Sequence, residues 1–176
     1  ACGGTYTTVA NVDNVTSSNE ITTFTTTNGT VYFVYIGHYN STTTGTFTIS
    51  RTCVTPPTNN NCSSAPALTI NSGSSCSSST NGTTVGANQS TAACVGTADD
   101  DVWYSFIANG TSQTLTVTPG TLSDAVLQVY SGTCAELTSL TCVDNTSGSS
   151  TETTTLTGLT NGATYYVRVH SYGNGT

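Results

Sequence analysis

Lysine and methionine are missing from this chain of 176 residues, and arginine occurs only at Arg51 and Arg168. Nucleic acids and anionic membrane surfaces are held largely through cationic side chains. A formal net charge of −7 with so few cations therefore argues against both kinds of partner. The absence of lysine also excludes covalent crosslinks within this segment that need an amine nucleophile.

Long apolar runs are absent too, since none approaches the roughly 20 residues of a membrane-spanning helix, and membrane insertion is not expected. Residues that fill helices are scarce, whereas threonine makes up roughly a quarter of the chain, far above its usual share. Threonine and valine are stiff at Cβ and fit a pleated surface. We therefore expect an all-β fold with almost no helix.

Seven cysteines, with only two histidines and no Cys-Xaa-Xaa-Cys pair, indicate disulfides rather than a zinc site. Disulfides persist in oxidising compartments, so we expect a secreted protein that is extracellular or at the cell surface. Cys134 and Cys142 flank a short segment and are expected to pair, with Cys76 and Cys94 as the second choice. Two partners remain open for Cys62, namely Cys53 or a cysteine beyond the chain.

Sequons for N-linked glycosylation occur at several asparagines, among them Asn14, Asn28, Asn40, Asn81 and Asn109. They fit a glycoprotein. A chain so rich in asparagine and threonine also produces such sequons by chance, so both interpretations stay open.

Two segments of the chain resemble each other: residues 28–39 match residues 161–172 at a spacing of 161 − 28 = 133. This repeat predicts β-sandwich modules in tandem. Residues 1–54 would be the C-terminal half of one module, residues 55–60 a Pro/Asn linker, and residues 61–176 a second module without its last strand. We expect the open edge beside residues 165–169 to be covered either by the continuation of the same polypeptide or by a strand from a neighbouring copy of the module or subunit.

Short alternating runs between turn residues predict eight strands in the second module, enough for a two-sheet sandwich. They span residues 68–71, 83–85, 102–107, 114–118, 126–130, 137–143, 153–156 and 164–170. In the last run, Tyr165 and Val167 are expected to face the core, whereas Arg168 and His170 should face solvent.

Four runs carry a family resemblance: Ala98-Asp-Asp-Asp-Val-Trp-Tyr-Ser-Phe106, then residues 124–134, 140–144 and 162–169. In this order they resemble the bacterial pre-peptidase C-terminal domain family, in its Cys-rich tandem form from secreted Bacteroidetes surface proteins. The resemblance covers residues 61–176, and residues 1–54 as a partial copy. It implies a jelly-roll-like β-sandwich without catalytic activity, attached to secreted hydrolases or repeated along adhesins. Some members of that family bind calcium, collagen or polysaccharide.

The densest chemical feature is the aspartate run Asp99, Asp100 and Asp101, with Asp124 as a companion. Hard oxygen ligands clustered in loops suit calcium, which makes these four residues a candidate calcium site. The alternative is that one aspartate caps a turn before the Trp103 strand while the others are solvated.

Aromatic side chains could contact a ligand, but neighbours in one strand face opposite sides of the sheet. Core packing is expected for Tyr104 and Phe106. Exposed contact through Trp103, Tyr166 or Tyr172 is the alternative for this group.

No nucleophile elbow, HExxH, P-loop or dinucleotide fingerprint is present, so we expect no enzyme activity, no catalytic residue and no cofactor other than calcium. The leading hypothesis is a structural or adhesive module of an extracellular filament or cell-surface adhesin, with surface polysaccharide as a second partner. The alternative is a module that binds carbohydrate or a matrix protein and is appended to a secreted hydrolase.

Overall fold

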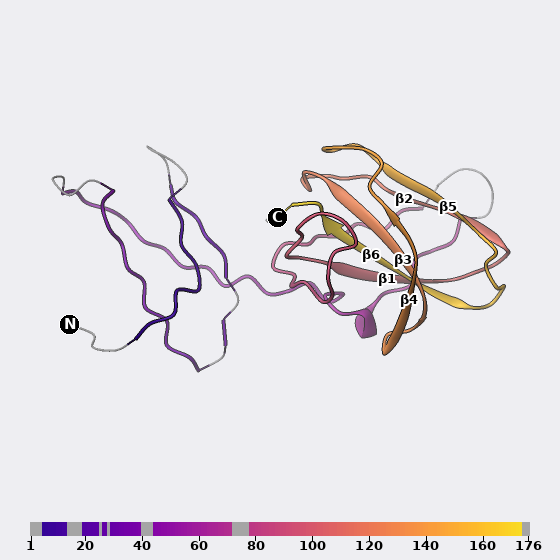
Figure 1. The fold of residues 1–176 in the computed structure, drawn as a ribbon, viewed down its shortest axis with the longest axis horizontal. Coiled ribbons are helices and arrows are strands. Elements are labelled where there is room, and N and C mark those ends of the chain that lie inside the picture. Colours follow the sequence, from indigo (N-terminus) through magenta and orange to yellow (C-terminus); the bar gives the residue numbers. More distant parts are fainter. Residues whose placement is uncertain are drawn as a thin grey trace. The chain divides into compact units, whose positions relative to one another are not determined.

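The computed structural model describes residues 5–13, 19–24, 26–27, 29–39, 44–71 and 78–173. The chain divides into two compact units, Ala1–Ile49 and Ser50–Thr176 (Figure 1). The described residues of the first unit contain no helix or strand, and none of them is buried. All regular structure described below belongs to the second unit.

The second unit is built from six strands and one short 3-10 turn, η1 (Cys62–Ser64). The strands are β1 (Val102–Ile107), β2 (Ser112–Val117), β3 (Ala125–Thr133), β4 (Glu136–Val143), β5 (Glu152–Thr157) and β6 (Thr164–Ser171). They form two antiparallel sheets, one with the order β1-β6-β3-β4 and the other made of β2 and β5. This is a single β-sandwich-like domain, and the described residues contain no α-helix.

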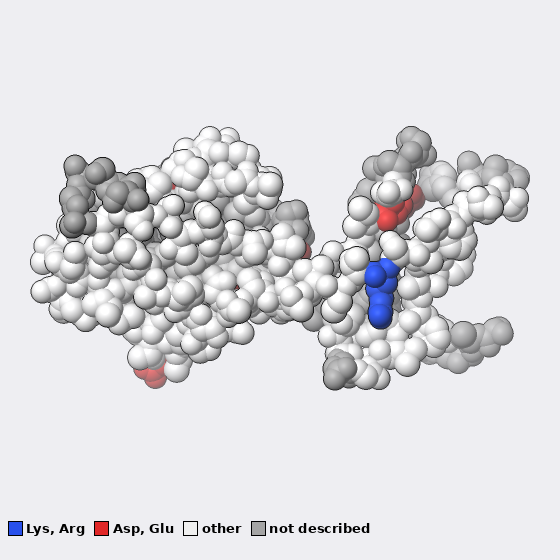
Figure 2. All heavy atoms as spheres, turned by 180° about the vertical axis from the view of Figure 1, so that it is seen from behind, with Lys and Arg blue, Asp and Glu red and all other residues white. Residues whose placement is uncertain are grey.

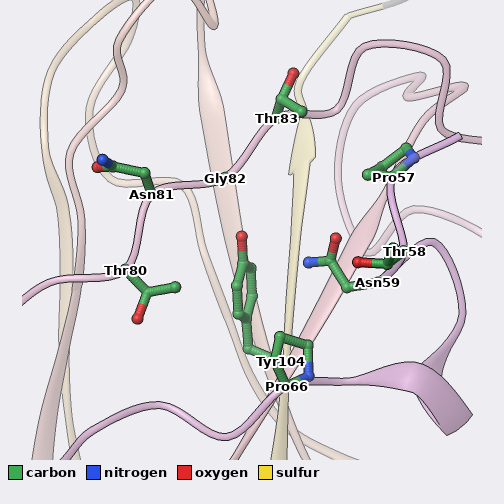
Figure 3. Close-up of a pocket in the computed structure, with 9 residues that line it drawn as sticks. All are labelled: Pro57, Thr58, Asn59, Pro66, Thr80, Asn81, Gly82, Thr83 and Tyr104. Atoms are coloured by element: carbon green, nitrogen blue, oxygen red, sulfur yellow. The ribbon is translucent and has the colours of Figure 1, made fainter. Parts of the chain in front are cut away.

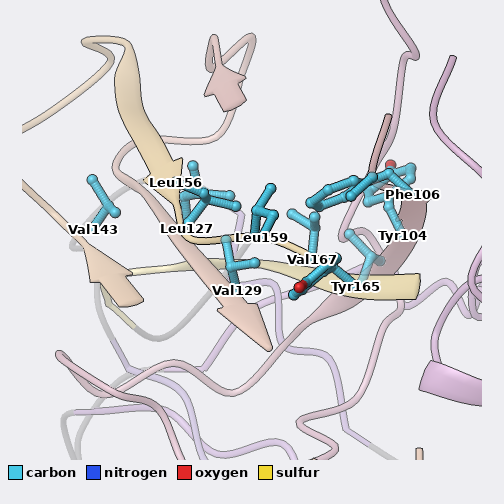
Figure 4. Packing of buried hydrophobic residues seen from close by; sticks show 11 residues of the cluster. Tyr104, Phe106, Leu127, Val129, Val143, Leu156, Leu159, Tyr165 and Val167 are labelled. Carbon is cyan, nitrogen blue, oxygen red and sulfur yellow. The ribbon is translucent and has the colours of Figure 1, made fainter. Parts of the chain in front are cut away.

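The core lies between the two sheets (Figure 4). Every second residue of β1 and β6 faces it, including Tyr104, Phe106, Tyr165 and Val167, as the alternation predicts. The rings of Phe106 and Tyr165 stack with their centroids 5.4 Å apart. Burial of this apolar face is the main force that holds the sandwich together.

Six of the eight strands expected from the sequence are confirmed. Residues 68–71 and 83–85 form no strand, although Ala67 makes an isolated parallel bridge to Ser105. The tandem arrangement of sandwich modules is wrong, because the residues that the structure describes form one such domain, in the second unit. Two segments resemble each other in sequence when both alternate between apolar and polar residues after an Asn-Gly turn. Such a resemblance does not show that a second sheet packs against each of them, which a sandwich requires.

The open edge expected beside residues 165–169 is also wrong. β6 lies inside the larger sheet, where it pairs with β1 on one side and β3 on the other. Its backbone groups are therefore already used in two ladders. Strand neighbours are set by tertiary topology, which the spacing between two similar segments does not encode.

The outward face of the larger sheet is buried as well, contrary to expectation for Arg168 and His170, both of which are 0% exposed. One cross-strand row on this face consists of Trp103, Arg168, Gln128 and Cys142. Residues 90–94 cover it, because the Arg168 guanidinium donates to the carbonyl oxygens of residues 91 and 92. The alternation of residues along a strand does not indicate whether a loop from elsewhere in the chain covers its outer face, so the burial of Arg168 and His170 could not be predicted from β6 alone.

Two disulfides connect the sheet to the segments that precede it. Cys62 pairs with Cys134 and Cys94 pairs with Cys142. The expected pairs Cys134–Cys142 and Cys76–Cys94 are therefore wrong, and neither of the two partners left open for Cys62, Cys53 or a cysteine beyond the chain, is its partner. Cys134 and Cys142 lie at opposite ends of the β3–β4 hairpin arm, and each meets a segment distant in sequence. Cys53 is exposed and unpaired, while Cys76 lies outside the described residues.

Candidate functional site

Strand β1 separates two surface cavities, because its successive side chains point to opposite faces of the sheet. Tyr104 lines one cavity and Trp103 the other. An aromatic platform that uses both rings is therefore excluded, as the sequence indicated.

The first cavity, called the Tyr104 cavity below, has a volume of about 360 Å³ (Figure 3). It is lined by residues 57–59, Pro66, residues 80–83 and Tyr104. Figure 3 shows the Tyr104 ring standing between the segment of residues 80–83 and the segment of residues 57–59. It is a shallow depression that is largely open to solvent, so a ligand there would contact one face of the molecule and would not be enclosed.

Backbone pairing with β1 fixes one wall of this cavity. The Trp103 backbone N–H donates to the Asn59 carbonyl at 2.8 Å, and the side-chain amide of Asn59 donates to the Trp103 carbonyl at 3.0 Å. Further along, Ser105 donates to the Pro66 carbonyl at 2.9 Å. Prolines suit this edge because the positions that they occupy need no N–H donor.

The opposite wall passes close to the Tyr104 ring at Gly82, where any side chain would require the ring to shift. A Cβ atom there would overlap the Tyr104 hydroxyl oxygen. The flanking side chains of Thr80, Asn81 and Thr83 are exposed and offer hydroxyl and amide groups at the rim. The cavity thus combines an aromatic floor with neutral polar groups.

The second cavity, called the Trp103 cavity, has a volume of about 470 Å³ and lies near the Cys62–Cys134 disulfide. Its aromatic rings, Trp103 and Tyr130, lie 5.4 Å apart and are 1% and 7% exposed. Burial raises the pKa of Tyr130 above its ordinary value, against the lowering effect of Arg168. The Trp103 indole N–H donates to Ser90 Oγ at 2.9 Å and to Asp101 Oδ1 at 3.0 Å, so its polar group is already satisfied.

Asp101 is the centre of a buried polar cluster behind Trp103. Its Oδ2 accepts hydrogen bonds from Arg168 Nη2 at 2.7 Å and Nε at 3.0 Å, and this ion pair is fully buried. The backbone N–H and the hydroxyl of Ser90 also donate to Oδ2, at 2.7 and 2.9 Å. Both carboxylate oxygens of Asp101 therefore have hydrogen-bond donors, and hydrogen bonds of this kind help to offset the cost of burying an ion pair.

The other aspartates of the expected calcium site lie in different surroundings. Asp99 is exposed, whereas Asp100 is buried beside Ser171, and Asp124 precedes β3. Within the described ranges, no three Asp, Glu, His or Cys side chains converge closely enough to hold a metal ion without other ligands. The calcium site made of all four aspartates stays a prediction, although the Asp101 carboxylate already forms an ion pair with Arg168.

The remaining expected site residues are spread over the domain. Trp103 is too deeply buried for exposed contact, Tyr166 is half-buried, and Tyr172 is 44% exposed. Of the sequon asparagines, Asn81 and Asn109 are exposed and thus accessible to a glycan. Their glycosylation stays a prediction. Asn14, Asn28 and Asn40 lie outside the described residues.

Sequence reasoning missed the walls of the Tyr104 cavity and the buried role of Arg168. One signal was available for the arginine, since a lone cation in an alternating strand, in a chain with an aspartate run, suggests a buried pair. No such signal exists for the cavity, whose walls come from segments without regular structure. The described residues also contain no helix that is long and apolar enough to span a membrane.

Glu152, at the start of β5, is a buried carboxylate that holds the loop after β4. It accepts from the backbone N–H of Asn145 at 2.9 Å and from the N–H and hydroxyl of Thr146 at 2.8 and 2.5 Å. Burial by itself would raise the pKa of Glu152, but these hydrogen bonds to the charged form bring it below its usual value.

The Glu152→Gln variant should lower the free energy of unfolding at pH 7 by about 1–3 kcal/mol. The NH₂ group of the new amide would face a backbone N–H of Asn145 or Thr146, so that two donors would meet without an acceptor. A lowered pKa in the folded state means that the carboxylate stabilises the protein above the unfolded pKa of about 4.3, and that this contribution is lost as the pH falls. Urea denaturation between about pH 5 and pH 3 should therefore show a smaller acid loss in the variant. Glu136→Gln, at an exposed site on β4, serves as the control. Equal acid dependence in wild type and Glu152→Gln would contradict this role.

The packed sheets, the two disulfides and the cavities beside β1 define a β-sandwich-like module of a kind found on secreted or surface proteins. A family model described as galactose binding domain-like, from the group associated with the type IX secretion system, matches residues 58–175, and the chain belongs to this family. Such domains are typically non-catalytic. Comparisons with curated proteins and with solved structures gave no match.

This family corrects the resemblance to the pre-peptidase C-terminal domain. The four runs that carried that resemblance coincide with β1, β3, β4 and β6, the strands of the larger sheet. Their alternation and aromatic content reflect what such a sheet needs for packing, and sandwich families share those needs.

Proposed function

We propose that Ser50–Thr176 is a non-catalytic carbohydrate-binding module of a secreted protein and that its ligand binds in the Tyr104 cavity. The observation that carries the proposal is membership in the galactose-binding-domain-like family over residues 58–175. The cavity supports it, because it is concave and combines one aromatic ring with a few polar side chains.

The chemistry of the cavity fits a neutral sugar. The Asn81 amide can donate to one sugar hydroxyl and accept from another, and the Thr80 hydroxyl can do the same. Pro57 and Pro66 provide apolar surface for the C–H face of a pyranose, while the Tyr104 ring, which is 8% exposed, contributes only its edge. Charged groups are sparse on the face shown in Figure 2, and the net charge of −7 disfavours acidic polysaccharides.

Binding is favoured over the purely structural filament or adhesin role. That hypothesis depended on tandem modules and an open sheet edge, whereas the described residues form one β-sandwich-like domain in which β6 is paired on both sides. The binding alternative needs only one folded module with a cavity.

A glycan array followed by titration calorimetry tests the proposal. We expect saturable binding to a neutral glycan, and at least tenfold weaker affinity in Asn81→Ala and Thr80→Val, a loss of about 1.4 kcal/mol. Asn109→Ala is the matched control, because it removes an exposed asparagine from another Asn-Gly-Thr sequon outside the cavity. Absence of binding to every glycan, or equal affinity in Asn81→Ala and Asn109→Ala, would refute the site.

A further inference from the structure

Two carboxylate oxygens in this domain, Oδ2 of Asp100 and Oδ1 of Asp124, are buried without any hydrogen-bond partner. Asp100 is only 2% exposed. Burial of a charged oxygen without a donor is costly, and native structures seldom leave one unless an ion or a water satisfies it. Among the residues that the structure describes, these two are the buried side-chain nitrogen or oxygen atoms without a hydrogen-bond partner.

Both aspartates are anchored at the same end of β6. The hydroxyl of Ser171 donates to Asp100 Oδ1 at 2.8 Å, and its backbone N–H lies 3.4 Å from the same oxygen. The next residue, Tyr172, donates its N–H to the Asp124 carbonyl at 2.9 Å. Because β6 lies between β1 and β3, the segments that enter these two strands meet here.

Negative charge accumulates at this end of the sheet. Asp144 follows β4, and its pKa is raised by burial and by the neighbouring charges of Asp124 and Glu152. Arg168, one of the two arginines, is already paired with Asp101. Burial lowers the pKa of His170, so its ring contributes little positive charge near neutral pH.

We propose that a calcium ion binds at the end of β6 through Oδ2 of Asp100 and Oδ1 of Asp124, with nearby backbone carbonyls and water completing its ligands. Calcium accepts six to eight oxygen ligands in flexible geometry, whereas magnesium demands a near-ideal octahedron and soft metals need nitrogen or sulfur. Relative to the four-aspartate site expected from the sequence, this site omits the exposed Asp99 and the Arg168-paired Asp101.

Thermal melting of the full chain in calcium, in magnesium and in chelator tests the proposal. A calcium concentration tenfold above the dissociation constant should raise the melting temperature by about 4 °C, because the ion binds only the folded state. Magnesium should have a much smaller effect. The variant Asp124→Asn should lose the calcium shift, while the equally charge-changing control Glu136→Gln should retain it.

Calorimetric titration with calcium provides the second measurement and does not depend on thermal unfolding. Asp124 is only partly buried, so Asp124→Asn is expected to fold, whereas Asp100→Asn would disturb a fully buried position. We expect at least tenfold weaker calcium binding in Asp124→Asn. No calcium response in the wild type, or the same response in wild type and Asp124→Asn, overturns the proposal, and neither outcome bears on carbohydrate binding in the Tyr104 cavity.

Discussion

Replacement of Arg168 by methionine is expected to lower the free energy of unfolding by about 3–5 kcal/mol, because it leaves the Asp101 carboxylate buried without its counter-charge. The guanidinium makes two hydrogen bonds to Asp101 Oδ2 and two more to the backbone carbonyls of residues 91 and 92. Loss of the arginine therefore also frees the segment that covers the outer face of the larger sheet. Urea denaturation followed by tryptophan fluorescence reports both effects, since Trp103 lies in the same cluster.

The chain supplies its own control for this experiment. Arg51 is the only other arginine and is exposed, so Arg51→Met removes the same charge and should change stability by less than about 0.5 kcal/mol. A double variant with Asp101→Leu should recover part of the loss, because it removes the uncompensated charge. Similar stabilities for Arg168→Met and Arg51→Met would contradict the buried pair.

The second large effect is expected from the disulfides. The Cys62–Cys134 bond links residues 72 apart and the Cys94–Cys142 bond residues 48 apart. In the chain-entropy model each constrains the unfolded state by about 4 kcal/mol. Double alanine variants at either pair should therefore unfold at much lower denaturant, and loss of Cys94–Cys142 should also loosen the covering segment of residues 90–94.

Mass spectrometry of non-reduced peptides checks the pairing directly and should recover Cys62 linked to Cys134 and Cys94 linked to Cys142. Cys53→Ala is the control for the stability measurement, because this cysteine is exposed and unpaired. A peptide that links Cys134 to Cys142, or a stability loss in Cys53→Ala as large as that of the paired variants, would contradict the assignment.

Where local pattern decides structure, the sequence was sufficient. β1 was predicted with its observed bounds, and the other five strands within a few residues, because alternation and flanking turn residues act along a single segment. The inward direction of Tyr104, Phe106 and Tyr165 follows from the same period of two. Composition likewise indicated disulfides and secretion, since cysteine usage reflects the redox compartment.

Only the tertiary structure decided which segments meet. The partner of Cys134, the burial of Arg168 and the two neighbours of β6 all depend on contacts between residues far apart in the chain. The candidate sites have the same origin, because the walls of the Tyr104 cavity come from irregular segments and the partnerless oxygens belong to Asp100 and Asp124, which precede two different strands. The sequence by itself determined that this chain forms strands and disulfides and that few of its residues are charged. Which groups lie side by side was fixed by packing, because burial and hydrogen bonding depend on the summed contacts of the folded chain and not on any one segment.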